Sequence, residues 1–191
     1  LADEPTGNLD TRSAEVVLNL FESLAAKGKT VIIVTHDPSI TQRTDQTIIL
    51  SDGEIIDPVV AVSLPFLTHP QMLAATHQLE TQTFQPGEII LREGEAVGYF
   101  YMIDAGDVEI VGGAHATRLA HLGPGQHFGE VELLKEVPAI ASVRAAGAVE
   151  IARLKKADFL AFLGSSALSQ KSFAEIVETR MAENKAQVKG H

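Results

Sequence analysis

The first part of the chain combines one helical pattern with one short run of β-branched residues. In Thr11–Lys27 the apolar side chains recur at the spacing of an amphipathic helix, and Asp10 and Gly28 suit its N-cap and its end. The run Thr30–Val34 is too short for a helix and is apolar on both faces, which is typical of a central strand in a parallel sheet. This order predicts an α/β segment.

The residues after this strand predict a short helix and a β-hairpin. The strand is followed by Thr35 and His36, and a short helix is expected over Ser39–Arg43. Gln46–Leu50 and Glu54–Ile56 are predicted as two strands, because the aspartate and glycine between them favour a tight turn.

From residue 58 onward the pattern changes. Residues 58–64 lack a steady periodicity and lie beside prolines, so they predict a linker. A short helix is expected over His69–Gln78. Beyond it, short alternating segments separated by glycines predict a barrel, roll or sandwich. The expected strands are Leu79–Phe84, Glu88–Arg92, Tyr99–Ile103, Val108–Val111 and Arg118–Leu122.

Composition narrows the classes of function. The 191 residues suffice for one large or two small domains, and an apolar fraction of 45% allows a sizeable core. No uninterrupted apolar run approaches the roughly twenty residues of a membrane span. The formal net charge of −10 disfavours broad contact with phosphate backbones, so no nucleic-acid partner is expected. The absence of cysteine excludes disulfides and thiol chemistry.

Candidate chemistry lies at the start of the chain, where Asp3 and Glu4 follow the apolar stub Leu1–Ala2. Pro5 has no amide hydrogen and therefore ends any strand here. In parallel sheets, ligands bind beyond the carboxyl ends of the strands. Both carboxylates would then face a bound nucleotide, and His36 follows the next predicted strand in the same way.

The segments DEPTGNLD (residues 3–10) and VTHDP (residues 34–38), together with the Asp52–Gly53 hairpin, carry a family resemblance. Residues 1–57 closely resemble the C-terminal third of an ABC transporter ATPase of the exporter and lipoprotein-release type. The matching motifs are the Walker B end, the D-loop and the switch histidine.

This resemblance implies a role for each polar side chain. Asp3 would hold the Mg²⁺ shell as a hard oxygen ligand, and Glu4 would orient or deprotonate the attacking water. His36 would contact the γ-phosphate, while Asn8 and Asp10 would communicate across a dimer of ATPase domains. The residues alone also allow plainer interpretations: exposed carboxylates at positions 3 and 4, a helix cap at position 10 and a strand-end hydrogen bond at position 36.

The phosphate-binding motifs of such an ATPase do not occur in the sequence. It contains neither a G-x-x-x-x-G-K-[ST] loop nor a Ser-Gly-Gly signature segment, and phosphoryl transfer depends on that loop. The chain is therefore expected to be the C-terminal fragment of a subunit that hydrolyses Mg-ATP, and to be inactive alone. The complete subunit would work with a second ATPase domain and a transmembrane permease, peripherally at the cytoplasmic face of the plasma membrane.

A second set of motifs follows. They are Phe84-x-Pro86-Gly87-Glu88, Arg92-Glu93-Gly94, Tyr99-Phe100-Tyr101, Leu122-Gly123-Pro124-Gly125, Phe128-Gly129-Glu130 and Ser142-Val143-Arg144-Ala145. Over about Leu64–Glu183 this pattern resembles the cyclic nucleotide-binding domain, a β-roll with flanking helices. Lys156–Gln187 is expected to form two helices, which in related sensors serve as lid and dimer helix, so the resemblance also implies a homodimer.

The same resemblance implies a pocket for cAMP or cGMP. In the family, a phosphate-binding cassette opens at Phe128 and Gly129 and continues to Ala141 and Ser142 here. Its backbone amides meet the cyclic phosphate, as amides do at other helix N-termini. Glu130 would accept a hydrogen bond from the ribose 2′-hydroxyl.

Three cassette positions depart from the family pattern. Ala139 stands where an arginine pairs with the phosphate, Ile140 where a small residue is usual, and Glu132 where an alanine lies beside the amide donors. Loss of one charge-assisted hydrogen bond costs about 1.5–3 kcal/mol. A carboxylate at position 132 adds repulsion if it faces the pocket, but not if it faces solvent. We therefore predict weak or no binding of cAMP and cGMP, with a docking module or a different small ligand as alternatives.

Together the patterns predict an α/β remnant of an ABC ATPase domain (residues 1–57), a linker (58–64) and an α+β domain (65–187) that is an antiparallel β-roll with flanking helices. The predicted function is the C-terminal part of an ATP-hydrolysing ABC transporter subunit with a regulatory roll. The alternative is a non-catalytic sensor or docking module with a relic ATPase segment. A transcription factor of the catabolite-activator type is disfavoured by the acidic charge.

Overall fold

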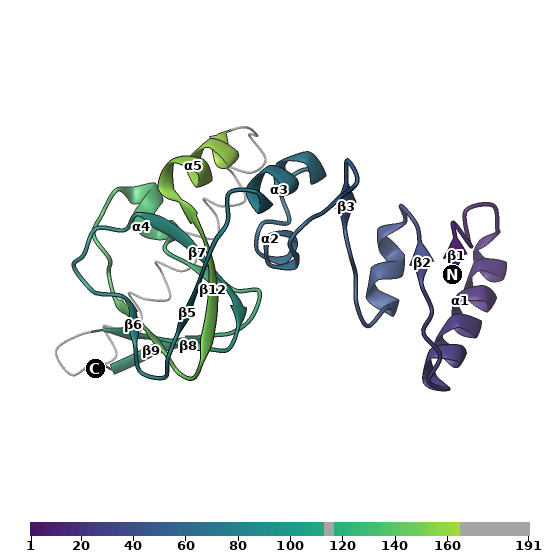
Figure 1. Cartoon of the computed structure of the whole chain (residues 1–191), viewed down its shortest axis with the longest axis horizontal. Coiled ribbons are helices and arrows are strands. Elements are labelled where there is room, and N and C mark those ends of the chain that lie inside the picture. The colour runs from purple at the N-terminus through teal and green to yellow at the C-terminus, as the bar shows by residue number, and fades with distance from the viewer. Residues whose placement is uncertain (113–116, 165–191) are drawn as a thin grey trace. The chain divides into compact units, whose positions relative to one another are not determined.

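The computed structural model describes residues 1–112 and 117–164 (Figure 1). The chain divides into two compact units, Leu1–Thr47 (unit 1) and the residues from Ile48 onward (unit 2). This division differs from the boundary expected after residue 57, because the predicted hairpin belongs to unit 2.

Unit 1 is a small α/β arrangement. Strands β1 (Ala2–Asp3) and β2 (Ile33–Val34) pair in parallel, and helix α1 (Thr11–Ala26) connects them. The 3₁₀ helix η1 (Pro38–Arg43) follows β2. Because parallel strands present their carboxyl ends at one edge, the residues after β1 and after β2 lie next to each other.

Polar side chains fix the position of the helices in unit 1. The Arg43 guanidinium of η1 donates hydrogen bonds to Glu22, Glu15 and Asn19 of α1 at 2.7, 3.0 and 2.6 Å. This contact ties the end of η1 to one side of α1.

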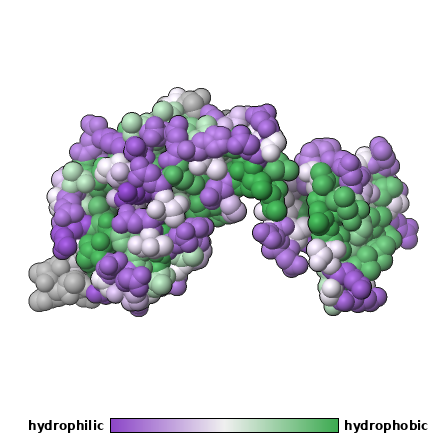
Figure 2. Space-filling view, in the orientation of Figure 1, coloured by the Kyte–Doolittle hydropathy of each residue, from purple (hydrophilic) through white to green (hydrophobic). Residues whose placement is uncertain are grey.

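Unit 1 leaves much of its apolar surface uncovered. No residue of α1 is buried, although an amphipathic helix normally buries its apolar face. The exposed large apolar side chains of the unit are Leu1, Leu9, Val16, Leu20, Leu24, Ile32 and Val34. Figure 2 shows apolar colour over much of the face of this unit that it displays.

Unit 2 begins with a hairpin and two short helices. Strands β3 (Leu50–Ser51) and β4 (Glu54–Ile55) pair antiparallel. Helix α2 (Pro58–Ser63) and helix α3 (His69–Thr76) follow. Residues 58–64, expected as a linker, therefore contain a helix.

Burial explains this helix. Val59 and Val60 are buried in an apolar cluster that also contains residues of α3 and of the roll, and Asp57 caps the first turn by accepting the amide of Val59. The apolar contacts outweigh the low helix propensity of consecutive valines.

The rest of unit 2 is a roll of two four-stranded antiparallel sheets. The strand orders are β10–β7–β12–β5 and β6–β11–β8–β9. The strands are β5 (Glu80–Phe84), β6 (Ile89–Leu91), β7 (Tyr99–Ala105), β8 (Val108–Gly112), β9 (Thr117–Leu122), β10 (His127–Phe128), β11 (Ser142–Ala145) and β12 (Val149–Lys155). The predicted antiparallel β-roll with flanking helices is confirmed, whereas β10, β11 and β12 were not predicted as strands.

Two further helices flank the roll. Helix α4 (Glu130–Lys135) lies between β10 and β11, and helix α5 (Lys156–Gly164) follows β12. Phe159 of α5 stacks on Phe100 of β7, with ring centroids 4.2 Å apart and an angle of 5° between the planes. The second helix predicted within Lys156–Gln187 lies outside the described residues.

Candidate functional site

The first candidate site lies at the carboxyl ends of β1 and β2. Oε1 of Glu4 is 2.8 Å from Nδ1 of His36 and accepts the backbone amide of His36 at 3.0 Å. The hydroxyl of Thr35 donates to Oε2 of Glu4 at 3.2 Å. The structure therefore brings Glu4 and His36 together, although they are 32 positions apart in the sequence. The role of Thr35 was missed; its only sequence signal is its place directly before His36.

The backbone and charge of Glu4 are both unusual. Its φ is +43°, in the left-handed region that residues with a Cβ rarely adopt and in which active-site residues are enriched. The hydrogen bond from the His36 side chain lowers the pKa of Glu4 below its ordinary value of 4.5. Glu4 is thus an ionised acceptor at neutral pH, and the His36 ring beside it is 89% exposed.

The other predicted residues of this edge are not in one cluster. Asp3 ends β1 and is exposed, as is Asn8 in the following turn. Asp10 is the N-cap of α1: it accepts the amides of Arg12 and Ser13, each at 3.0 Å. This is the geometry of the plainer interpretation, a helix cap.

The metal-binding capacity of this edge is limited. Among the residues that the structure describes, no group of three or more acidic or histidine side chains is arranged to hold a metal ion. Mg²⁺ in nucleotide sites usually takes one or two carboxylates, with phosphates and waters as its other ligands. Asp3, which ends β1, can supply one such carboxylate.

The second candidate site is the cassette from β10 through α4 to β11. Gly129 opens it with a φ of +92°, and a Cβ at this position would lie 3.0 Å from the carbonyl oxygen of Tyr99. The ring of Phe128 stacks on Tyr101 at 4.8 Å, which fixes the cassette against β7. Glu130 begins α4 and is 1% exposed.

The structure settles the direction of Glu132. Its side chain is buried, with the residue 8% exposed, and its Oε1 accepts the backbone amide of Ile140 at 3.3 Å. Of the two orientations that the sequence left open, solvent exposure is therefore wrong. The carboxylate faces inward and spans the cassette from α4 to the segment before β11.

The end of the cassette is anchored to the loop after β6. Ala139 is buried; its amide donates to the carbonyl of Glu95 and its carbonyl accepts the amide of Gly94, both at 2.8 Å. The Ser142 hydroxyl accepts the amide of Glu93 at 2.9 Å, and Ala141 is buried. Hydrogen bonds within the protein therefore hold the segment around Ala139 and Ala141 in place.

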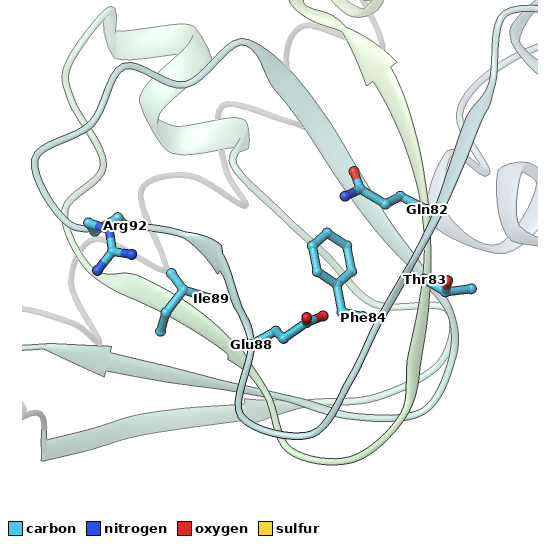
Figure 3. Close-up of a pocket in the computed structure, with 6 residues that line it drawn as sticks. All are labelled: Gln82, Thr83, Phe84, Glu88, Ile89 and Arg92. Atoms are coloured by element: carbon cyan, nitrogen blue, oxygen red, sulfur yellow. The ribbon is translucent and has the colours of Figure 1, made fainter.

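A shallow hollow lies beside β5 and β6 (Figure 3). It is lined by Gln82, Thr83, Phe84, Glu88, Ile89 and Arg92. None of these residues belongs to the cassette, so the hollow does not mark the predicted nucleotide pocket. In the part of the chain that the structure covers, no helix combines the length and the apolar character of a membrane span.

Comparison with known families identifies the roll. Residues 81–166 match the family model described as the cyclic nucleotide-binding domain. The chain therefore carries a domain of this family, which confirms the resemblance of its motifs.

Two relatives are named as ABC transporter ATP-binding proteins. YvrO of Bacillus subtilis, whose printed name calls it uncharacterized, is 52% identical over 56 residues, which are 29% of this chain and 24% of YvrO. A protein of Mycobacterium tuberculosis, also printed as uncharacterized, is 31% identical over 150 residues, which are 76% of this chain and 39% of that protein. The chain spans only these minor shares of both relatives. Because 150 aligned residues exceed unit 1, which ends at Thr47, the second alignment includes residues of unit 2.

Solved structures of kinase subunits resemble the chain in three dimensions. One is the regulatory subunit of a cAMP-independent protein kinase A from Trypanosoma brucei, as a triple mutant bound to cAMP in its A site. It is 27% identical, with a TM-score of 0.54 over 64% of this chain and 49% of that one. The corresponding subunit from Trypanosoma cruzi, bound to guanosine, is also 27% identical, with a TM-score of 0.51 over 64% and 48% of the two chains.

The three substitutions in the T. brucei mutant have the same spacing as three cassette residues of this chain. They replace a glutamate by alanine, a threonine seven positions later by arginine, and a valine one position after that by alanine. Glu132, Ala139 and Ile140 are separated by the same intervals. Before mutation, that subunit thus has a glutamate at the first of the three positions and a threonine, not an arginine, at the second. This chain likewise has Glu132 at the first position and Ala139 at the second.

Proposed function

We propose that this chain is the C-terminal part of an ATP-hydrolysing subunit of an ABC transporter, fused to a regulatory roll. The observation that carries the proposal is the contact of Glu4 with His36 at the carboxyl ends of two parallel strands. In this role Glu4 orients the attacking water and accepts its proton, and His36 contacts the γ-phosphate. Mg-ATP supplies the transferable phosphoryl group, with Asp3 as one ligand of the cation. Asn8 and Asp10 contact the second ATPase domain.

The uncovered apolar surface of unit 1 supports this proposal. A 16-residue amphipathic helix without a buried residue and a two-residue parallel ladder are insufficient for a stable α/β domain. The remainder of an ATPase domain would cover α1 and extend the sheet beside β2. The alignment of the M. tuberculosis relative across both units supports the fusion. A permease would then hold the subunit at the inner face of the plasma membrane.

The test uses the complete subunit, expressed from the reading frame that includes the sequence upstream of Leu1. We expect Mg-dependent ATP hydrolysis that Glu4→Gln lowers by about 10²-fold or more, since this is the typical contribution of a general base. The matched control is Glu54→Gln, on the exposed hairpin, which should keep the rate. Equal rates in wild type and Glu4→Gln would contradict the proposal, and an upstream frame without a phosphate loop would favour the non-catalytic alternative.

For the roll, we propose an uncharged purine nucleoside as ligand in place of a cyclic nucleotide. Support comes from the guanosine bound to the T. cruzi subunit and from the shared spacing of Glu132, Ala139 and Ile140. The test is calorimetry of the 191-residue chain with guanosine, adenosine, cAMP and cGMP. We expect saturable heat with at least one nucleoside and weak or no heat with both cyclic nucleotides. Binding of cAMP or cGMP at about micromolar concentration or below would contradict it.

A further inference from the structure

We propose that the Glu132 carboxylate takes the place of the ligand phosphate and is the residue that determines which ligands the roll accepts. This inference rests on the proposed nucleoside site and deepens it. The cassette of a cyclic nucleotide-binding domain presents backbone amides to an anion. Here the protein provides an anion of its own, since Glu132 accepts the amide of Ile140 from inside the cassette.

The charge of the cassette agrees with this interpretation. Between Gly129 and Ser142 the chain carries Glu130, Glu132 and Glu136 but only one cation, Lys135. The nearest arginine in sequence, Arg144, pairs with Glu109 at 2.6 Å. Within the cassette itself, therefore, no arginine offsets the repulsion between a ligand phosphate and the buried Glu132 carboxylate.

An uncharged nucleoside meets the same groups favourably. An ionised carboxylate can accept about four hydrogen bonds, and the amide of Ile140 uses one of these on Glu132. The 5′-hydroxyl of a nucleoside is a donor, whereas the cyclic phosphate that replaces it in cGMP has no donor and carries a negative charge. Glu130 would accept from the ribose in both cases. The geometry thus favours ligands with a free 5′-hydroxyl.

The experiment is calorimetry of the 191-residue chain with guanosine, 5′-deoxyguanosine and cGMP. In wild type, guanosine should bind about tenfold more tightly than the other two ligands, which is the effect of about one charge-assisted hydrogen bond. Glu132→Gln keeps the size of the side chain and should strengthen cGMP binding about tenfold. The double variant that combines Glu132→Ala with Ala139→Arg should strengthen cGMP binding about a hundredfold.

Glu136→Gln is the matched control, because it removes one charge from the same cassette at an exposed position and should leave cGMP binding unchanged. Thermal unfolding of each variant verifies that it is folded. If neither Glu132 variant gains cGMP affinity, or if Glu136→Gln gains as much, the inference is overturned. A wild-type chain that binds no nucleoside would overturn the proposed ligand, whereas the cGMP gain in the variants reports on Glu132 separately.

Discussion

Glu4 and His36 hold each other at the edge of unit 1 through two contacts on one oxygen: Oε1 of Glu4 accepts the backbone amide of His36 at 3.0 Å and lies 2.8 Å from its Nδ1. These contacts keep the Glu4 side chain in place although its own backbone is in a strained region. In the proposed ATPase, His36 would both position the base Glu4 and contact the γ-phosphate, so its truncation should lower activity.

We therefore expect His36→Ala to lower ATP hydrolysis by the complete subunit by about 10²-fold, as the loss of one preorganised polar group commonly does. Turnover at saturating Mg-ATP is the measurement. His77→Ala is the control, because His77 also pairs with a glutamate, Glu54 at 2.9 Å, but lies in unit 2. Equal turnover in the two variants would argue against a role for the Glu4–His36 contact.

The same contact predicts a pH dependence. The pKa of Glu4 is lower in the folded chain than its ordinary value of 4.5, chiefly because of the His36 hydrogen bond. Ionised Glu4 therefore stabilises unit 1 above pH 4.5, and this contribution is lost as the pH falls through the lower folded value. NMR titration of the Glu4 side-chain carboxyl carbon in the complete subunit should show the low midpoint in wild type and a midpoint closer to 4.5 in His36→Ala. A midpoint that the substitution leaves unchanged would rule out His36 as the cause.

Phe159 is expected to anchor α5 on the roll. It is 1% exposed and stacks on Phe100. Truncation of a buried phenylalanine leaves a cavity, so Phe159→Ala should lower the free energy of unfolding by about 3–5 kcal/mol in urea titrations. Val62→Ala, at a side chain that is 63% exposed, should change it by less than about 0.5 kcal/mol. Similar losses in both variants would contradict this packing.

Substitutions at two glycines allow the energetic cost of left-handed backbone strain to be measured separately from that of a steric collision. Gly87 has a φ of +84° and open space around it, whereas a Cβ on Gly106, at +78°, would collide with the carbonyl oxygen of Ala148. Gly87→Ala should cost only the left-handed strain of about 1–2 kcal/mol. Gly106→Ala should cost more, because β7 and β12 must move apart. Urea unfolding of the two variants measures the difference, and equal costs would mean that the turn at Gly106 relaxes freely.

The short alternating strands and the glycines between them predicted a barrel, roll or sandwich, and only the resemblance of the motifs to the cyclic nucleotide-binding domain predicted the β-roll. The predicted strand Thr30–Val34 forms a ladder over only Ile33–Val34, since β1 supplies just two residues opposite it. Strand length here depends on the neighbouring strand, which the β-branched pattern of one segment does not contain. Helix α2 was missed for a related reason: Val59 and Val60 form a helix only because the roll and α3 bury them.

The prediction of the site residues was limited in the same way, because local sequence does not reveal which residues lie next to each other in the fold. The motifs around Glu4 and His36 predicted one shared edge, and the register of β1 with β2 explains why the two side chains meet. The direction of Glu132 could not be predicted, because a six-residue helix such as α4 can turn either side inward. Only the amide of Ile140, eight residues further along the chain, determines that its carboxylate lies inside.

Joining the two proposals, we propose that a nucleoside bound to the roll regulates the ABC ATPase to which the roll is fused. The most direct test is the ATP hydrolysis rate of the complete subunit, measured with and without saturating guanosine, with cGMP as the matched anionic ligand. We expect guanosine to change the rate and cGMP at the same concentration to leave it unaltered. A subunit that hydrolyses no ATP, or one whose rate is the same with and without the nucleoside, would contradict the claim.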